Sequence, residues 1–100
     1  MNSKLLSILG ICRRAGLLSA GYDACADAIR TKKAKILFVS VDASEKTQKN
    51  IIYEAERAGV LYRKIKFTED EINQATGKKA KLLTVNDRGL AAKASDLWEE

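Results

Sequence analysis

The chain has 100 residues, of which 46% are hydrophobic and 31% are charged, and it carries a net charge of +5. A chain of this size forms about one domain with its own core, so we expect a single domain over residues 1–100. It contains no stretch of about 18 apolar residues, which excludes a membrane-spanning helix.

The first half of the chain predicts two helices and a buried strand. Apolar residues at helical spacing indicate a helix over residues 4–15, and a short extended piece follows at 17–19. A second helix is expected over residues 22–31, with small apolar side chains on its inner face. The unbroken apolar run over residues 35–41 is rich in β-branched and aromatic side chains, which predicts a strand covered on both faces.

The second half continues this alternation, and polar residues that cap helices mark where its helices begin. In chain order we expect a helix over 45–58 capped by Asp42 or Ser44, a strand over 60–66, a helix opened by a capping box of Thr68 and Glu71 and ended by Gly77, a strand over 82–85, and a last helix capped by Asn86 or Asp87.

This order of elements is typical of an α/β fold in which helices cover both faces of a sheet. We therefore predict a three-layer α/β/α sandwich of about four strands with alternating helices, and we expect its sheet to be mainly parallel. The sequence has no proline and no internal repeat, so it indicates neither a linker nor a second domain.

The composition gives little support for catalysis or for a metal site. The chain has no histidine, and its two cysteines, Cys12 and Cys25, do not form a Cys-x-x-Cys pair. Motifs for a nucleophile elbow, a phosphate loop and a dinucleotide site are also absent. We expect a cytoplasmic protein with two buried, reduced thiols that has no metal, no cofactor, no small-molecule substrate and no enzymatic activity.

The positive charge is placed unevenly. Residues 1–50 contain nine Lys and Arg against four Asp and Glu, whereas residues 51–100 contain nine of each. All of the excess therefore belongs to the first half. Such an asymmetry favours an anionic partner, with nucleic acid ahead of a membrane surface.

The start of the second expected helix is a candidate binding element. After Ala20, the residues Gly21, Tyr22, Asp23 and Ala24 open this helix. Because glycine has no capping side chain, the backbone N–H groups of the first turn stay uncovered, which suits a phosphate or a base edge. The Tyr22 ring could also stack on an unpaired base, although a packed tyrosine is the more frequent case.

Two basic clusters and one turn complete the candidate site. In parallel α/β sheets, ligands favour the carboxyl ends of strands, where Gly21 and the turn after the central strand are expected. The loop 77–81 joins them only if the last strand is antiparallel or the loop curls over. The three segments comprise Asp42, Ala43 and Ser44 in the turn, Arg30, Lys32, Lys33 and Lys35 before the central strand, and Lys78, Lys79, Ala80 and Lys81 in the loop.

Four blocks in this order resemble a known family, namely RRAGLLSAG, AIRTKKAKILFVSVDAS, GKK and VNDRGLA. The chain resembles the kink-turn-binding ribosomal protein superfamily (L-seven-Ae and L-thirty-e type) over nearly its whole length, and it is most similar to the small bacterial branch called YlxQ. The resemblance implies an α/β/α sandwich and a ribosome-associated protein that binds RNA bent sharply by a three-nucleotide bulge beside sheared G·A pairs.

The resemblance also implies which residues contact RNA, and the chain departs from the family pattern at three of them. Strong binders carry Gly-x-Asn-Glu-x-x-Lys at the start of the second helix, where this chain has Gly21, Asp23, Ala24 and Asp27. The loop 77–81 matches a second contact region that usually offers apolar side chains, but here it is basic. These departures leave an alternative open: a protein-interaction module on the same fold that has lost strong RNA affinity.

Overall fold

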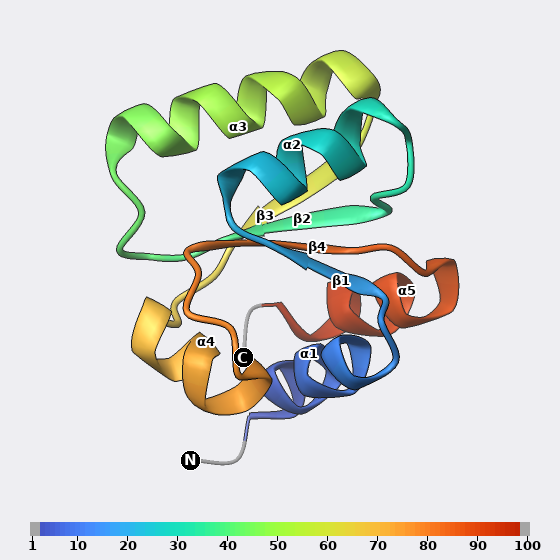
Figure 1. Cartoon of the computed structure of the whole chain (residues 1–100), viewed down its shortest axis with the longest axis vertical. Helices are drawn as coiled ribbons and strands as arrows, with labels where there is room; N and C mark the ends of the chain where they lie inside the picture. The colour runs from blue at the N-terminus through green and yellow to red at the C-terminus, as the bar shows by residue number, and fades with distance from the viewer. Residues whose placement is uncertain (1–2, 99–100) are drawn as a thin grey trace.

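The computed structural model describes residues 3–98, which form five helices and four strands that alternate along the chain (Figure 1). The helices lie close to the predicted segments, and the strands are shorter than predicted in two cases. The elements are α1 (Lys4–Arg14), β1 (Leu18–Ala20), α2 (Tyr22–Arg30), β2 (Ile36–Val39), α3 (Glu45–Ala58), β3 (Leu61–Lys64), α4 (Glu69–Thr76), β4 (Leu82–Val85) and α5 (Arg88–Leu97).

Three helix starts follow the capping signals in the sequence. The Thr68 hydroxyl accepts from the Glu71 amide, and the Glu71 carboxylate accepts from the Thr68 amide, which is the predicted capping box of α4. Between the two expected caps of α3, Ser44 is the N-cap. Of the two expected caps of α5, Asn86 and Asp87, Asp87 is the N-cap. Its carboxylate accepts from the Leu90 amide at 2.9 Å.

The four strands form one sheet in the order β1-β4-β2-β3. Strand β4 lies between β1 and β2 and is antiparallel to both, whereas β2 and β3 are parallel. Strands β1, β2 and β3 therefore run in one direction, and β4 runs against them. The expectation of a mainly parallel sheet was wrong, because two of its three strand pairs are antiparallel.

The reversal of β4 has a physical reason in the position of α4. This helix has eight residues and is about 12 Å long. It packs on α1 beside the carboxyl ends of β2 and β3, so the chain is still at that end of the sheet when β4 begins (Figure 1). The approach of α4 to α1 is close: a Cβ atom at Gly10 would lie 2.8 Å from the carbonyl oxygen of Ala75.

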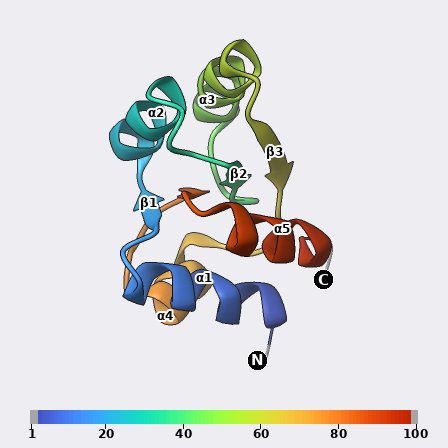
Figure 2. The same cartoon turned by 90° about the vertical axis from the view of Figure 1, so that its right-hand side faces the viewer.

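The helices form two layers around the sheet. Helices α2 and α3 cover one face, and α1, α4 and α5 cover the other (Figure 2). Each interface has its own apolar cluster: Phe38 and Leu83 face α1, α4 and α5, whereas Leu37 and Leu82 face α2 and α3. The predicted α/β/α sandwich is confirmed. Among residues 3–98, no helix combines the length and the apolar character needed to cross a bilayer.

Candidate functional site

The carboxyl ends of β1 and β2 and the start of β4 meet at one end of the sheet. The Gly21 amide, just after β1, donates to the Leu82 carbonyl at 2.9 Å, and the Ser40 amide, just after β2, donates to the Lys81 carbonyl at 2.8 Å. The sequence placed the loop 77–81 at this end of the sheet only if the last strand is antiparallel or the loop curls over. Strand β4 is antiparallel to both of its neighbours, so the loop does lie at this end. We call this region the loop surface and define it as residues 20–24, 41–44 and 77–81.

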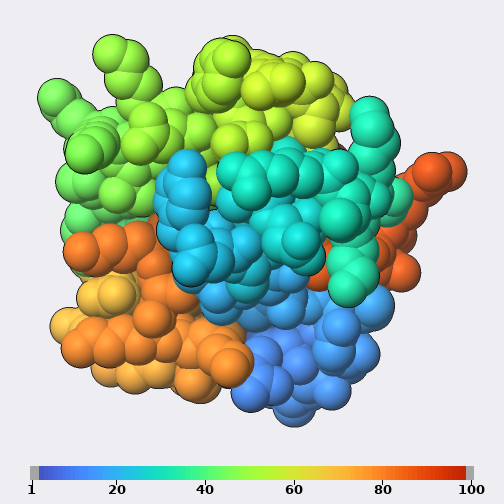
Figure 3. Space-filling view, turned by 45° about the horizontal axis from the view of Figure 1, so that its top comes forward, coloured from blue at the N-terminus to red at the C-terminus, as the bar shows by residue number. Residues whose placement is uncertain are grey.

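The three segments adjoin one another on the outside of the molecule. In Figure 3 the light-blue atoms at the start of α2 touch the orange atoms of the segment before β4, and the green atoms of the segment leading into α3 lie beside both. Ala20, the last residue of β1, pairs with Leu83 and is half-buried below this surface.

The tip of α2 is open. Gly21 is its N-cap, with φ 92° and ψ 164°, and no side chain caps the helix. A Cβ atom built at Gly21 would have nothing within 4 Å. The N–H groups of the first turn have no partner within the helix, and they lie at the positive end of its dipole. This tip can therefore receive a negatively charged or hydrogen-bond-accepting group.

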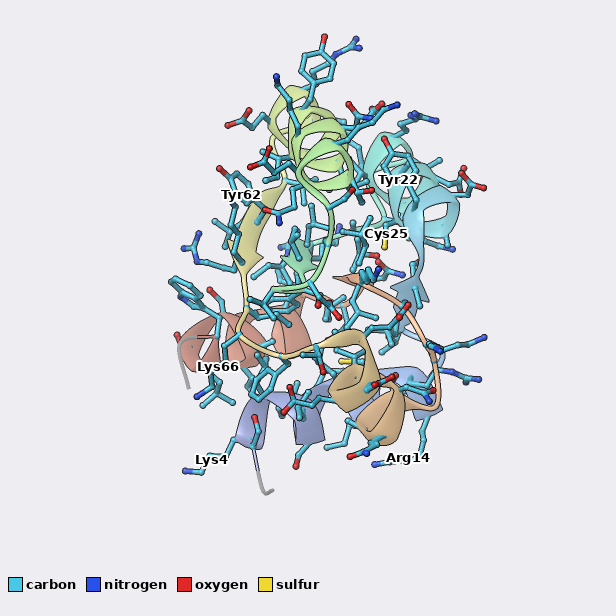
Figure 4. All side chains as sticks on the ribbon, turned by 90° about the vertical axis from the view of Figure 1, so that its left-hand side faces the viewer. Lys4, Arg14, Tyr22, Cys25, Tyr62 and Lys66 are labelled. Atoms are coloured by element: carbon cyan, nitrogen blue, oxygen red, sulfur yellow. The ribbon has the colours of Figure 1, made fainter. Side chains whose placement is uncertain are left out.

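The side chains that follow Gly21 differ in their exposure. Tyr22 is half-buried and packs against the apolar cluster beneath α2 and α3, where Figure 4 shows it between the two helices. Asp23 and Ala24 are exposed. Behind them, Cys25 is fully buried, and its burial raises the pKa of the thiol to about 12. Cys12 is also buried and free, as expected.

In the turn after β2, polar groups hold the turn in shape. The Asp42 carboxylate accepts from the Ser40 hydroxyl and from the Glu69 amide, the latter at 3.2 and 3.3 Å, so it connects this turn to the first turn of α4. The Ser40 hydroxyl, followed by that amide and the charge of Lys81, lowers the pKa of Asp42. This carboxylate is engaged within the protein.

The other two predicted residues of the turn are engaged as well. Ser44 caps α3, with its hydroxyl accepting from the Thr47 amide at 3.1 Å. The Ala43 side chain is buried, and its carbonyl accepts from Gln48 Nε2 at 2.8 Å. This segment therefore contributes the shape of the surface more than side chains for a ligand.

The loop 77–81 presents cations. Lys78, Lys79 and Lys81 are exposed, and within residues 3–98 none of them forms a salt bridge. The Lys78 amide donates to Thr76 Oγ1 at 3.1 Å, which fixes the loop to the end of α4. Ala80 is buried, so its methyl group is not on the surface.

One exposed apolar side chain at this end of the sheet is absent from the sequence prediction. Val41 lies between Ser40 and Asp42, two residues after the end of β2, and 57% of it is exposed. Its amide donates to the Phe67 carbonyl at 3.3 Å. The sequence placed Val41 in an unbroken apolar run and so implied burial. The signal against burial was its position next to Asp42, where the chain turns toward α3.

Lys33 does not join the loop surface. It lies with Lys32 and Lys35 in the connection that follows Arg30, the last residue of α2, and the Lys35 amide donates there to the Val85 carbonyl at 2.9 Å. This is the opposite end of the sheet. The physical reason is the direction of α2, which carries the chain about 14 Å from Gly21 before the basic residues begin.

Within the described part of the chain, no group of three or more acidic, cysteine or histidine side chains is placed to hold a metal ion. The loop surface combines an open helix tip, three cations and one apolar side chain. Such a surface suits a large anion with apolar parts better than it suits acid–base chemistry.

Two known proteins are similar to this chain over nearly its whole length. The chain is 38% identical over 96 residues to the RNA-binding protein YlxQ of Enterococcus faecium, covering 96% of this chain and 92% of that one. It is 30% identical over 93 residues to the RNA-binding protein YlxQ of Bacillus subtilis, covering 92% of each chain. No family model matches the chain.

Two solved structures share the fold. A protein of unknown function from Bacillus halodurans superposes with a TM-score of 0.90 at 24% identity, over 99% of this chain and 100% of that one. The 15.5kD RNA binding protein of Giardia lamblia superposes with a TM-score of 0.75 at 14% identity, over 97% of this chain and 87% of that one.

Proposed function

The chain belongs to the YlxQ-like branch of the L-seven-Ae-type superfamily, and from this premise we propose that it is an RNA-binding protein that recognises kinked RNA through the loop surface. In this proposal it is a non-enzymatic, ribosome-associated, cytoplasmic protein that works as a single domain without a metal or a cofactor.

The observation that carries the proposal is the convergence of an open helix tip and three lysines on one end of the sheet. The N–H groups of Tyr22, Asp23 and Ala24 can donate to base edges or phosphate oxygens. Lys78, Lys79 and Lys81 can neutralise phosphates of the adjoining backbone. A bent RNA offers both kinds of group over a short distance.

The side chains of the helix tip shape the kind of recognition that we expect. The Asp23 carboxylate can accept hydrogen bonds from guanine amino groups, but it cannot donate as an asparagine would. Ala24 offers no base contact. Each missing bidentate base contact removes about 1–3 kcal/mol of discrimination. Phosphate contacts therefore supply much of the affinity, which makes binding strongly dependent on salt.

Val41 gives this surface one apolar contact. Ala80 and Leu82 are buried and cannot contact a bulged base, whereas Val41 is exposed beside the turn. We infer that Val41 takes the place that apolar side chains of the loop occupy in other members of the superfamily.

A second candidate function is supported by the charges at the start of α2. Asp23 and Asp27 lie on exposed positions of this helix, where a phosphate would be repelled. A protein-interaction module that has lost strong RNA affinity would tolerate them. The first discriminating observation is whether purified protein carries ultraviolet-absorbing nucleic acid at low salt and releases it at high salt.

The proposal is tested by titrating the protein with a kink-turn RNA and with an unbulged duplex of equal length. We expect the kink-turn RNA to bind more tightly. Equal affinity for the kink-turn RNA and the duplex would contradict the proposed recognition of RNA shape. If neither RNA binds, the protein-interaction module is favoured.

A further inference from the structure

A second group of cations gathers at the end of the sheet opposite the loop surface. Figure 2 looks at this end, where the connection from α2 to β2 lies between the end of α3 above and the start of α5 below. We call it the distal basic surface, and it consists of Arg30, Lys32, Lys33, Lys35, Arg57 and Arg88.

The cations of this surface lie around two shallow hollows. Arg30, Lys32 and Arg57 line one hollow beside Glu54 and Ala58. Lys35 and Arg88 line the other, next to Leu61. Because Lys32 and Lys35 belong to one short turn, the two hollows are neighbours. A side-chain hydrogen bond from Lys35 Nζ to the Lys32 carbonyl at 3.3 Å closes this turn.

Most of these cations form no salt bridge in the described part of the chain. The Arg30 guanidinium forms a salt bridge with Glu54 at 2.8 Å. Within residues 3–98, none of the other five cations of this surface forms a salt bridge. Arg57 instead lies over the Tyr53 ring, 5.6 Å from its centre. Concentrated positive charge that is mostly outside salt bridges is available to an anion from outside.

Helix stability explains only part of this cluster. Arg30 and Arg57 lie in the last turns of α2 and α3, where cations stabilise the helix dipole. Arg88 lies in the first turn of α5, where a cation is unfavourable. Lys32 has φ 62°, a left-handed conformation that usually favours glycine. The helix dipole therefore does not account for the cation at Arg88, and the backbone conformation does not account for a lysine at position 32.

We propose that the distal basic surface binds the phosphate backbone of a second segment of RNA, apart from the kinked segment that fills the loop surface. Lysine and arginine side chains in an open turn neutralise phosphates without reading base sequence. Helix α2 separates the two surfaces by about 14 Å. Between them this helix exposes Asp27, whose negative charge disfavours one continuous track of phosphates along the helix.

This inference rests on the proposed function in one respect, because a kinked RNA is taken to occupy the loop surface. The experiment first saturates the protein with a short kink-turn RNA and then titrates a labelled unbulged RNA duplex, with binding followed by fluorescence anisotropy. It compares wild-type protein with K32A/K33A/K35A and with the control K4A/K64A/K93A, whose three exposed lysines lie on α1, β3 and α5 and belong to neither surface. Both variants lower the net charge from +5 to +2.

We expect the saturated wild-type protein to bind the duplex and the distal variant to lose most of this binding. The slope of log affinity against log salt should flatten by up to about three in that variant. Its affinity for the short kink-turn RNA should change less than twofold, and the control variant should behave as wild type does in both titrations.

Equal duplex binding by the distal and control variants would overturn the inference. So would an equal loss of kink-turn and duplex binding in the distal variant, because it would mean that the two surfaces are not separate. If the wild-type protein binds duplex through these lysines but shows no preference for kinked RNA, the proposed function fails and the distal surface stands.

Discussion

Gly21 donates its amide hydrogen to the carbonyl oxygen of Leu82 at 2.9 Å, which fixes the tip of α2 to the residue where β4 begins. The preceding carbonyl, that of Lys81, accepts from Ser40 at 2.8 Å. Two consecutive carbonyl groups thus hold the ends of the two strands that flank β4. Any ligand that contacts the helix tip is therefore next to the lysine loop.

Removing the cations of that loop should weaken RNA binding and make it less dependent on salt. The variant K78A/K79A/K81A loses up to three phosphate contacts, so the slope of log affinity against log salt should flatten by up to about three. The measurement is a series of anisotropy titrations with a kink-turn RNA at increasing salt. K4A/K64A/K93A is the matched control, and a slope that changes equally in both variants would argue against the loop as a binding element.

Replacing Gly21 by alanine should destabilise the fold. The backbone at Gly21, with φ 92° and ψ 164°, lies in a region that is essentially restricted to glycine. We expect Gly21→Ala to lower the free energy of unfolding by about 1–3 kcal/mol in chemical denaturation. Gly89→Ala is the control, because Gly89 lies within α5, has no left-handed φ, and a Cβ atom there would meet only Asp87 Oδ2 at 3.5 Å.

The control should be as stable as wild type or more stable by up to about 1 kcal/mol, since alanine favours a helix over glycine. If Gly21→Ala proved as stable as Gly89→Ala, the tip of α2 would not have the conformation described. The new methyl group would also project into the open space at the tip. RNA affinity should therefore fall under conditions in which the variant is fully folded.

Asp42 should make the stability of the protein depend on acid. Its pKa is lowered in the folded state by the Ser40 hydroxyl, the Glu69 amide and Lys81. A lowered folded pKa means stabilisation that is complete above the ordinary pKa near 4 and is lost as pH falls through the folded value. Wild-type protein should lose more stability between pH 7 and pH 3 than Asp42→Asn does. Equal losses, measured by urea denaturation at both pH values, would show that the carboxylate does not stabilise this turn.

Local signals in the sequence were sufficient for the elements and their caps. The apolar run of residues 35–41 contains β2, the capping box of Thr68 and Glu71 opens α4, and the periodicity of residues 45–58 gives the bounds of α3. These features depend on residues close together in the chain. The sandwich followed from their alternation, since each helix has to bury one apolar face against the sheet.

The direction of β4 and the position of Lys33 could not be read in the same way. Both depend on which end of the sheet the chain has reached, and that is decided by the length and packing of α2 and α4. Helix α2 carries Lys33 away from the loop surface, whereas the short α4 leaves Lys78 beside it. Burial of Ala80 and exposure of Val41 likewise depend on tertiary packing that composition does not reveal.

The most direct test of the central claim, that the loop surface is one RNA-binding site, is a nuclear magnetic resonance titration of nitrogen-15-labelled protein with a short kink-turn RNA without flanking arms. We predict that the largest amide shift changes fall on Tyr22, Asp23 and Ala24 and on residues 78–81, and that both groups saturate at the same RNA concentration. If these amides stay unchanged while those of other elements shift, or if the two groups titrate independently, the claim is contradicted.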